Sequence, residues 1–296
     1  MNRREFLKLT GMAGVGAMLP WEVQTLAAAV PPDMVIAQGA LPRNVTQAAI
    51  EAMGGMKRFI AQGDIVVVKP NIGWDRGPEY AANTNPEVVA TLVMLCLEAG
   101  ARRVKVFDNP VNDARRCYVQ SGIADAARRA GAEVSFTDDR KFKDMAINGD
   151  ELRNWPLYTD IFEADKVINV PIAKTHGLTR LTLGIKNWMG IMGGRRGRIH
   201  FGIDRKLVDV ARVIKPTLTV LDAVRILTAG GPQGGDLRDV KKLDTVAVGI
   251  DPVSIDAFGA TLFGLTGHDI GHVKLAQTAG LGTMDFQKLK INRIKL

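Results

Sequence analysis

Short apolar runs rich in β-branched residues alternate with helical patterns along this chain, and that alternation restricts the folds it can adopt. The run Ile65–Val68 lies between Gly63-Asp64 and Lys69-Pro70-Asn71. Such a run is typical of a strand that is buried on both faces of a sheet. Downstream, Asn85-Pro86-Glu87 offers a helix cap and a first-turn proline, and Gly100 offers a helix end. The pattern therefore predicts a strand followed by a helix.

The same alternation continues to the C-terminus. Further strands are expected over 103–107, 132–136, 166–172, 217–221, 245–250 and, at an edge, 289–294. Helices are expected over 46–62, 86–99, 121–130, 204–214, 252–263 and 269–279. Strands that alternate with helices indicate parallel βαβ units. We therefore expect an α/β domain over residues 30–296, with a mostly parallel sheet, helices on both faces, and one body or two lobes.

The N-terminus is typical of an export signal. It joins the charged start Met1–Lys8, a short Gly/Ala-rich apolar centre and the small residues Ala27-Ala-Ala29. Paired Arg3-Arg4 indicates the twin-arginine export machinery as a partner. We expect a signal over residues 1–29 and a periplasmic or otherwise exported protein. The alternative is an amphipathic or anchoring helix, although the apolar centre is too short to span a ~30 Å hydrocarbon core.

Charge and cysteine content exclude two classes of protein. The net charge of +8 favours anionic partners, but no zinc-finger spacing, aromatic RNA-binding pattern or basic helix accompanies it, so we expect no nucleic acid. Cys96 and Cys117 are the only cysteines, and an all-cysteine iron–sulfur cluster needs four thiolates. Whether these two form a disulfide stays open, because sequence does not give their geometry.

A glycine-rich basic segment follows the strand expected at 166–172. It contains Lys174-Thr-His176, Lys186-Asn187 and, among the glycines of 193–200, Arg195, Arg196 and His200. Arginine and lysine are the usual partners of carboxylate and phosphate, and glycine lets backbone approach a ligand closely. A solvated basic loop is the alternative. The segment favours a site for a small anionic ligand.

Polar residues also end several other predicted strands. Lys69 and Asn71 follow the first, Asp108-Asn109 the second, and Asp222 and Asp251 the later ones. If these strands are parallel, their carboxyl ends share one edge, where open α/β sheets bind ligands. The sequence therefore predicts that these side chains converge on a crevice. The turn Gly230–Gly235 is expected to cover that crevice as a flap.

An ordered set of motifs resembles the DUF362 family. The matching stretches are 66–71, 84–89, 98–101, 170–176, 182–187, Gly190, His200, Asp222, 230–234, 251–256 and 279–282. Family members often carry ferredoxin-type cysteine motifs, which this chain lacks, so an iron–sulfur cofactor does not transfer. A weaker analogy exists with nickel-pincer lactate racemases, which also join lysines and histidines in a two-lobed α/β protein.

The resemblance implies a single site, whose residues are Lys69, Asn71, Lys174, His176, Lys186, Asn187 and His200. Chemistry suggests that lysines with Arg195 or Arg196 bind anionic oxygens, and that the two histidines carry protons or bind a metal. Asp222, Asp251 and Asp256 could coordinate a divalent cation. We expect an exported enzyme of redox or isomerising chemistry, whose catalytic residues are Lys174, His176, Lys186 and His200. The alternative is a non-catalytic protein that holds a cofactor or metal for a partner enzyme.

Overall fold

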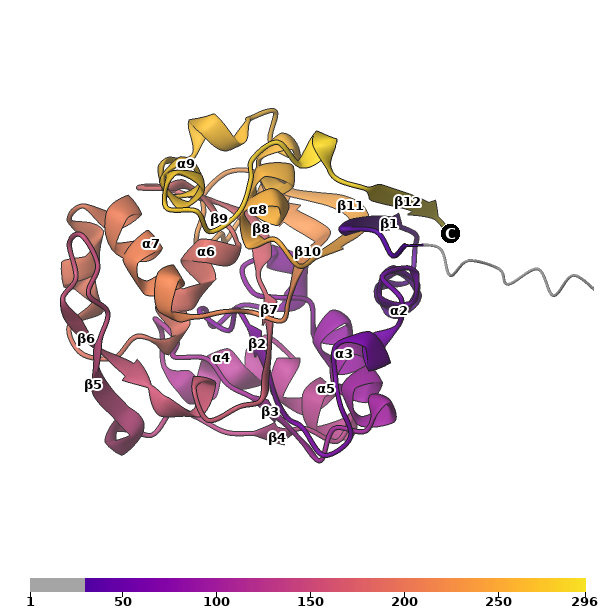
Figure 1. Ribbon diagram of the computed structural model, residues 1–296, viewed down its shortest axis with the longest axis horizontal. Coiled ribbons are helices and arrows are strands. Elements are labelled where there is room, and N and C mark those ends of the chain that lie inside the picture. Colours follow the sequence, from indigo (N-terminus) through magenta and orange to yellow (C-terminus); the bar gives the residue numbers. More distant parts are fainter. Residues whose placement is uncertain (1–29) are drawn as a thin grey trace, which may run out of the picture. The chain divides into compact units, whose positions relative to one another are not determined.

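The structure, a computed structural model, describes residues 30–296, and residues 31–296 form one compact unit. The predicted export signal lies outside the described residues. The α/β class is confirmed, with a mostly parallel sheet and helices packed on both of its faces (Figure 1). Across residues 30–296, no helix combines the length and apolar character needed to cross a bilayer.

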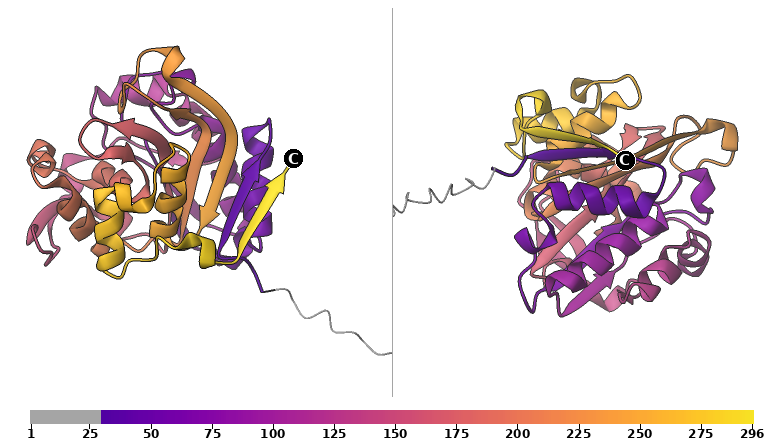
Figure 2. Two further views of the ribbon diagram at one scale, coloured as in Figure 1. Left: turned by 90° about the horizontal axis from the view of Figure 1, so that it is seen from above. Right: turned by 90° about the vertical axis from the view of Figure 1, so that its right-hand side faces the viewer.

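The main sheet has ten strands. Eight follow the order β12-β1-β11-β10-β7-β2-β3-β4, while β8 pairs with β10 and β9. Their bounds are β1 Met34–Gln38, β2 Ile65–Pro70, β3 Arg103–Val106, β4 Glu133–Val134, β7 Lys166–Val170, β8 Ile172–His176, β9 Arg180–Thr182, β10 Leu218–Leu227, β11 Val240–Gly249 and β12 Ile291–Lys295. Four successive pairs in this order are parallel, namely β10–β7, β7–β2, β2–β3 and β3–β4. Figure 2 shows β12 beside β1 at the far edge.

Eight α-helices accompany the sheet within the described part of the chain. They are α2 Pro42–Ala52, α3 Pro86–Ala99, α4 Ala114–Gln120, α5 Ile123–Arg129, α6 Gly184–Asn187, α7 Ile203–Val213, α8 Pro252–Thr261 and α9 Gly271–Thr278. Helices α2, α3 and α5 cover one face and α6 to α9 the other (Figure 1). Alternate strand residues pack on opposite faces: Val66 and Val68 contact the first set, and Val67 contacts the second.

The local signals set the bounds of α3 and β2. Asn85 caps α3, its side chain accepting from Glu87 N at 2.9 Å, and Gly100 ends the helix with a positive φ of 112°. The helix expected over 46–62 instead begins at Pro42 and ends at Ala52, before Gly54 and Gly55. Several elements had no prediction, among them β1, β9, helices α4 and α6, and the antiparallel hairpin of β5 Phe142–Ala146 and β6 Asn154–Tyr158.

Two features of the sheet correct the sequence interpretation. The strand expected over 166–172 breaks at Pro171 and resumes as β8, so Lys174 and His176 lie on a strand rather than in a loop. Strand β11 runs antiparallel to β10. Its carboxyl end, followed by Asp251, therefore lies at the edge opposite to the carboxyl ends of β2, β3 and β7.

Candidate functional site

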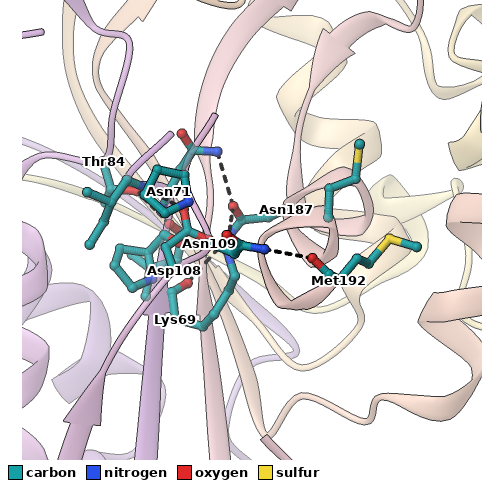
Figure 3. A network of polar contacts seen from close by, with 12 residues as sticks. Lys69, Asn71, Thr84, Asp108, Asn109, Asn187 and Met192 are labelled. Atoms are coloured by element: carbon teal, nitrogen blue, oxygen red, sulfur yellow. Dashed lines mark hydrogen bonds and ion pairs between the residues drawn. The ribbon is translucent and has the colours of Figure 1, made fainter. Parts of the chain in front are cut away.

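A buried polar network joins the carboxyl ends of β2 and β3 to helix α6 (Figure 3). Lys69 Nζ donates to Asp108 Oδ1 at 2.8 Å and to Asn187 Oδ1 at 3.2 Å. Asn71 Nδ2 donates to the same Asn187 oxygen at 3.3 Å. Burial lowers the pKa of Lys69, and the Asp108 carboxylate opposes that effect. Residues from three distant parts of the sequence thus meet, as the predicted convergence at the sheet edge requires.

Directly above this network lies a cavity of about 410 Å³. Seven of the predicted catalytic and ligand-binding residues line it: Asn71, Lys174, His176, Lys186, Asn187, Arg196 and His200. The other two lie elsewhere. Lys69 is enclosed beneath the cavity with no exposed surface, and Arg195 is exposed outside the lining.

Lys174 reaches the cavity from β8 and is anchored by two acceptors. Its ammonium donates to Asn71 Oδ1 at 3.1 Å and to the carbonyl of Ala82. It also lies 6.0 Å from the centre of the Trp74 ring, within the range of a cation–π contact. Burial, followed by repulsion from Lys186, holds the pKa of Lys174 well below its usual range.

Lys186 differs from the other two buried lysines in having no oxygen acceptor. Its Nζ lies 3.3 Å from the Met189 sulfur, the one hydrogen-bond contact it makes among residues 30–296. Burial, followed by repulsion from Arg196, lowers the pKa of Lys186 to about 8. This amine is therefore close to half-neutral near pH 8, and its neutral form carries a lone pair.

Asp256 fixes the helix that carries Lys186. Its carboxylate accepts from Gly184 N at 2.6 Å and from Ile185 N at 2.9 Å, at the start of α6. A Cβ on Gly184 would lie 2.8 Å from Asp256 Oδ1, so glycine is required for this approach. Burial raises the pKa of Asp256 to about 7. Its role in the structure is to position α6.

The two histidines of the cavity differ in environment. His176 Nδ1 accepts from Leu178 N at 3.1 Å and from Thr179 N at 3.3 Å, which puts the ring proton on Nε2. Burial and the nearby lysines lower the pKa of His176 to about 3, so the ring is neutral and can donate from Nε2. His200 is exposed at the opening and contacts only the carbonyl of Gly197, at 3.2 Å, within the described chain.

Arg196 holds the loop that follows β3. Its guanidinium donates to the Asn109 carbonyl at 2.6 Å and to the carbonyl of Pro110. Both partners are neutral carbonyls, so they do not neutralise the positive charge of the guanidinium. Burial lowers the pKa of Arg196, which nevertheless stays protonated.

The three aspartates proposed as metal ligands do not come together. Asp222 lies inside β10 and accepts from Asn85 N at 2.7 Å and Val224 N at 3.0 Å, while Asp256 holds α6. Asp251 caps α8, accepting from Val253 N at 2.8 Å, and lies at the other edge of the sheet. No group of three or more His, Cys, Asp or Glu within residues 30–296 could hold a metal ion. These three aspartates therefore do not form one cation site.

Asp108, Trp74 and Thr182 also line this cavity. Asp108 was expected at the crevice as a strand end but had no assigned role, and no role was predicted for Trp74 or Thr182. Thr182 Oγ1 is buried without a hydrogen-bond partner in the described region. Gly190 lies so close to the network that a Cβ would overlap Asp108 Oδ1 and lie 2.5 Å from Lys69 Nζ. Of the proposed flap, Pro232 reaches the lining.

The chain matches the family model described as "Domain of unknown function (DUF362)" over residues 66–261. The protein belongs to the DUF362 family. A thylakoid-associated protein of Synechocystis sp. is 30% identical over 200 residues, which cover 64% of this chain and 61% of that relative. The chain thus spans about three fifths of the relative's length. A crystal structure of a protein from Thermotoga maritima gives a TM-score of 0.40 at 11% identity, covering 81% of this DUF362 chain and 60% of the other.

Proposed function

We infer that this DUF362 protein binds a small anionic ligand in the cavity and acts on it as an enzyme. The observation that carries the inference is a surplus of positive charge on side chains that are buried or, for Arg196, half-buried. Lys174, Lys186 and Arg196 line the cavity, and none of them forms an ion pair with a carboxylate within residues 30–296. The one carboxylate in the lining, Asp108, already pairs with Lys69. Because buried charges are costly unless paired, this cavity favours an anion.

One further observation supports a ligand with a polar acceptor. His176 carries a ring proton on Nε2 and has no acceptor for it among the described residues. A bound carboxylate or carbonyl oxygen would accept from it.

Catalysis, rather than storage, is supported by Lys186. An amine that is enclosed, unpaired and shifted in pKa to about 8 is suited to proton transfer or nucleophilic attack near neutral pH. The solvent-exposed His200 at the opening could exchange protons with water. The lysine, His176 and His200 are therefore the groups we assign to chemistry.

Calorimetric titration with inorganic phosphate, pyruvate and 3-phenyllactate tests the binding proposal. We expect at least one anion to bind, with an affinity that falls about tenfold or more in Lys186→Met. Lys143→Met is the matched control, since Lys143 is exposed on β5. If none of the three anions binds the wild-type protein, the proposal is rejected. Binding of an anion that is retained unchanged over long incubation would instead favour the alternative, a holding or maturation protein.

The location of the protein is a second part of the proposal. We place it outside the cytoplasmic membrane because Arg3-Arg4 and the apolar stretch after them fit twin-arginine export. Cell fractionation with N-terminal sequencing should find the mature protein beginning near Val30. Replacing both arginines with lysine should retain the uncleaved chain in the cytoplasm. Normal export of that double variant would contradict the assignment.

A further inference from the structure

Three lysines lie at this site, and they differ in the hydrogen-bond acceptors that hold their amines. Lys69 is held by Asp108, Asn187 and the Pro70 carbonyl. Lys174 is held by Asn71 and the Ala82 carbonyl. Lys186 contacts only a thioether, a weak acceptor, within the described chain. Of the three amines, Lys186 is thus the one that can move toward a ligand without breaking a strong hydrogen bond.

The surroundings of Lys186 are those of a nucleophilic amine. It is only 7% exposed and lies among other cations, with Arg196 acting on it and its own charge acting on Lys174. Desolvation beside a second cationic group activates a lysine because both disfavour the ammonium form. The neutral amine that results carries a lone pair, which attacks carbonyl carbon.

The rest of the lining suits a carboxylate next to that carbonyl. Lys174 and Arg196 provide positive charge on the walls, and His176 can donate from Nε2. Cationic and neutral donors of this kind bind a carboxylate and a carbonyl oxygen together.

An apolar part of the same cavity indicates what else the ligand carries. Trp74, Val111, Met189 and Pro232 line it. A volume of about 410 Å³ is within the range of pockets that enclose drug-sized ligands. A three-carbon acid would leave this apolar surface uncovered, whereas an aryl or branched side chain would bury it.

We propose that Lys186 condenses with the carbonyl of a 2-oxo acid that bears an apolar substituent, forming an imine. The proposal rests on the proposed function, since it names the ligand class of the same cavity. The Nζ lone pair attacks C2 and forms the N–C bond, and one Nζ proton passes to the C2 oxygen to give a carbinolamine. The second Nζ proton leaves with the hydroxyl as water, which breaks the C–O bond and leaves Nζ=C2. Amine and ketone thus give imine and water, with no oxidant or reductant. His176 lines the same cavity and can donate a hydrogen bond from Nε2 to the departing oxygen.

Reductive trapping tests the imine. The full-length mature protein is incubated with phenylpyruvate and cyanoborohydride, and its intact mass is then measured. We expect one adduct per chain, equal in mass to the acid less one oxygen atom, and peptide mapping should place it on Lys186. Lys186→Met should lose the adduct, and Lys143→Met should keep it. Pyruvate, without the apolar group, should be trapped about tenfold or more less efficiently at equal concentration.

The outcomes separate this inference from the proposed function. 3-Phenyllactate has the same shape without the ketone, so it should bind by calorimetry and should protect against trapping by phenylpyruvate. If phenyllactate binds but no adduct forms on Lys186, the imine is rejected and anion binding stands. An adduct on Lys174 instead of Lys186 would overturn the assignment of the nucleophile. If neither acid binds nor is trapped, the 2-oxo acid class is rejected.

Discussion

Lys69 Nζ lies 2.8 Å from Asp108 Oδ1 in a buried pair, in which Asp108 lines the cavity and Lys69 is enclosed behind it. The partners come from β2 and from the end of β3, two parallel neighbours. Asp108 also accepts from Ile72 N at 2.6 Å, so one carboxylate fixes the ends of both strands. The pair therefore defines the edge of the sheet on which the site is built.

Removal of Lys69 should be strongly destabilising. In Lys69→Met the Asp108 carboxylate stays buried without its cation, and we expect urea denaturation to show a loss on the order of 3–5 kcal/mol. The double variant Lys69→Met/Asp108→Asn removes both charges and should recover a large part of that loss. Equal stabilities of the single variant and the wild type would contradict the buried pair.

Gly190 should tolerate no side chain. A Cβ at this position would overlap Asp108 Oδ1, so Gly190→Ala has to displace the Lys69–Asp108 pair. Overpacking of this kind costs ~1–3 kcal/mol, and we expect a loss at the upper end of that range in thermal or urea unfolding. Gly197→Ala is the matched control, because nothing lies within 4 Å of a Cβ there. Equal losses in the two variants would argue against close packing at Gly190.

Local sequence signals predicted those helices and strands whose bounds depend on neighbouring residues. The Asn85 cap and Gly100 end predicted the bounds of α3, and the β-branched run at 65–68 predicted β2. The convergence of Lys69 and Lys174 followed from one rule about the carboxyl ends of parallel strands, whereas Lys186 was assigned to the same site on the family resemblance. The rule holds where the strands are parallel.

Strand direction, by contrast, is not a local property. The run at 245–250 has the same apolar pattern in either direction, so Asp251 was expected at the site edge, whereas β11 is antiparallel. Asp222 was expected at a strand end, but β10 continues to Leu227 because β11 and β8 pair with its second half. The carbonyl partners of Arg196 are likewise tertiary contacts, which no sequence pattern encodes.

Asp256 should control the site from outside the cavity. In Asp256→Ala the amides of Gly184 and Ile185 lose their buried acceptor. A buried donor without an acceptor costs ~1–3 kcal/mol, and this change leaves two such donors. We expect lower stability in urea and weaker anion binding in calorimetry, because α6 also carries Lys186 and Asn187. Asp256→Asn keeps one acceptor and should be intermediate. Unchanged binding in a folded Asp256→Ala protein would mean that α6 is positioned by other contacts.

Lys186→Met should change the pH dependence of stability. The folded-state pKa of about 8 lies below the ordinary value of 10.5, so the folded protein is penalised wherever Lys186 is charged. The loss of folding free energy is complete below pH 8, where Lys186 is charged in both states. It disappears as the pH rises to 10.5, because between these values the unfolded chain binds a proton that the folded protein has lost. At pH 7 the variant should be more stable by on the order of 2 kcal/mol.

The difference in unfolding free energy between wild type and Lys186→Met isolates this effect, since all other groups titrate in both proteins. That difference should shrink between pH 8 and 10.5. Arg196 lowers the pKa of Lys186 and Asp204 raises it, so substitution of either residue would shift this pH range. A difference that does not vary with pH would show that Lys186 titrates as an ordinary exposed lysine.

Cys96 and Cys117 should behave as two buried free thiols. They lie in α3 and α4, and burial raises the pKa of Cys96 to about 12 and that of Cys117 to about 11. Because the thiolate is the reactive form, labelling of the folded protein by Ellman's reagent should be roughly 100-fold or more slower than labelling of free cysteine. In guanidinium without reductant, the protein should release two thiols per chain, and Cys117→Ser should release one. A count of zero before reduction would mean that the two cysteines form a disulfide and would contradict the free thiols of the structure.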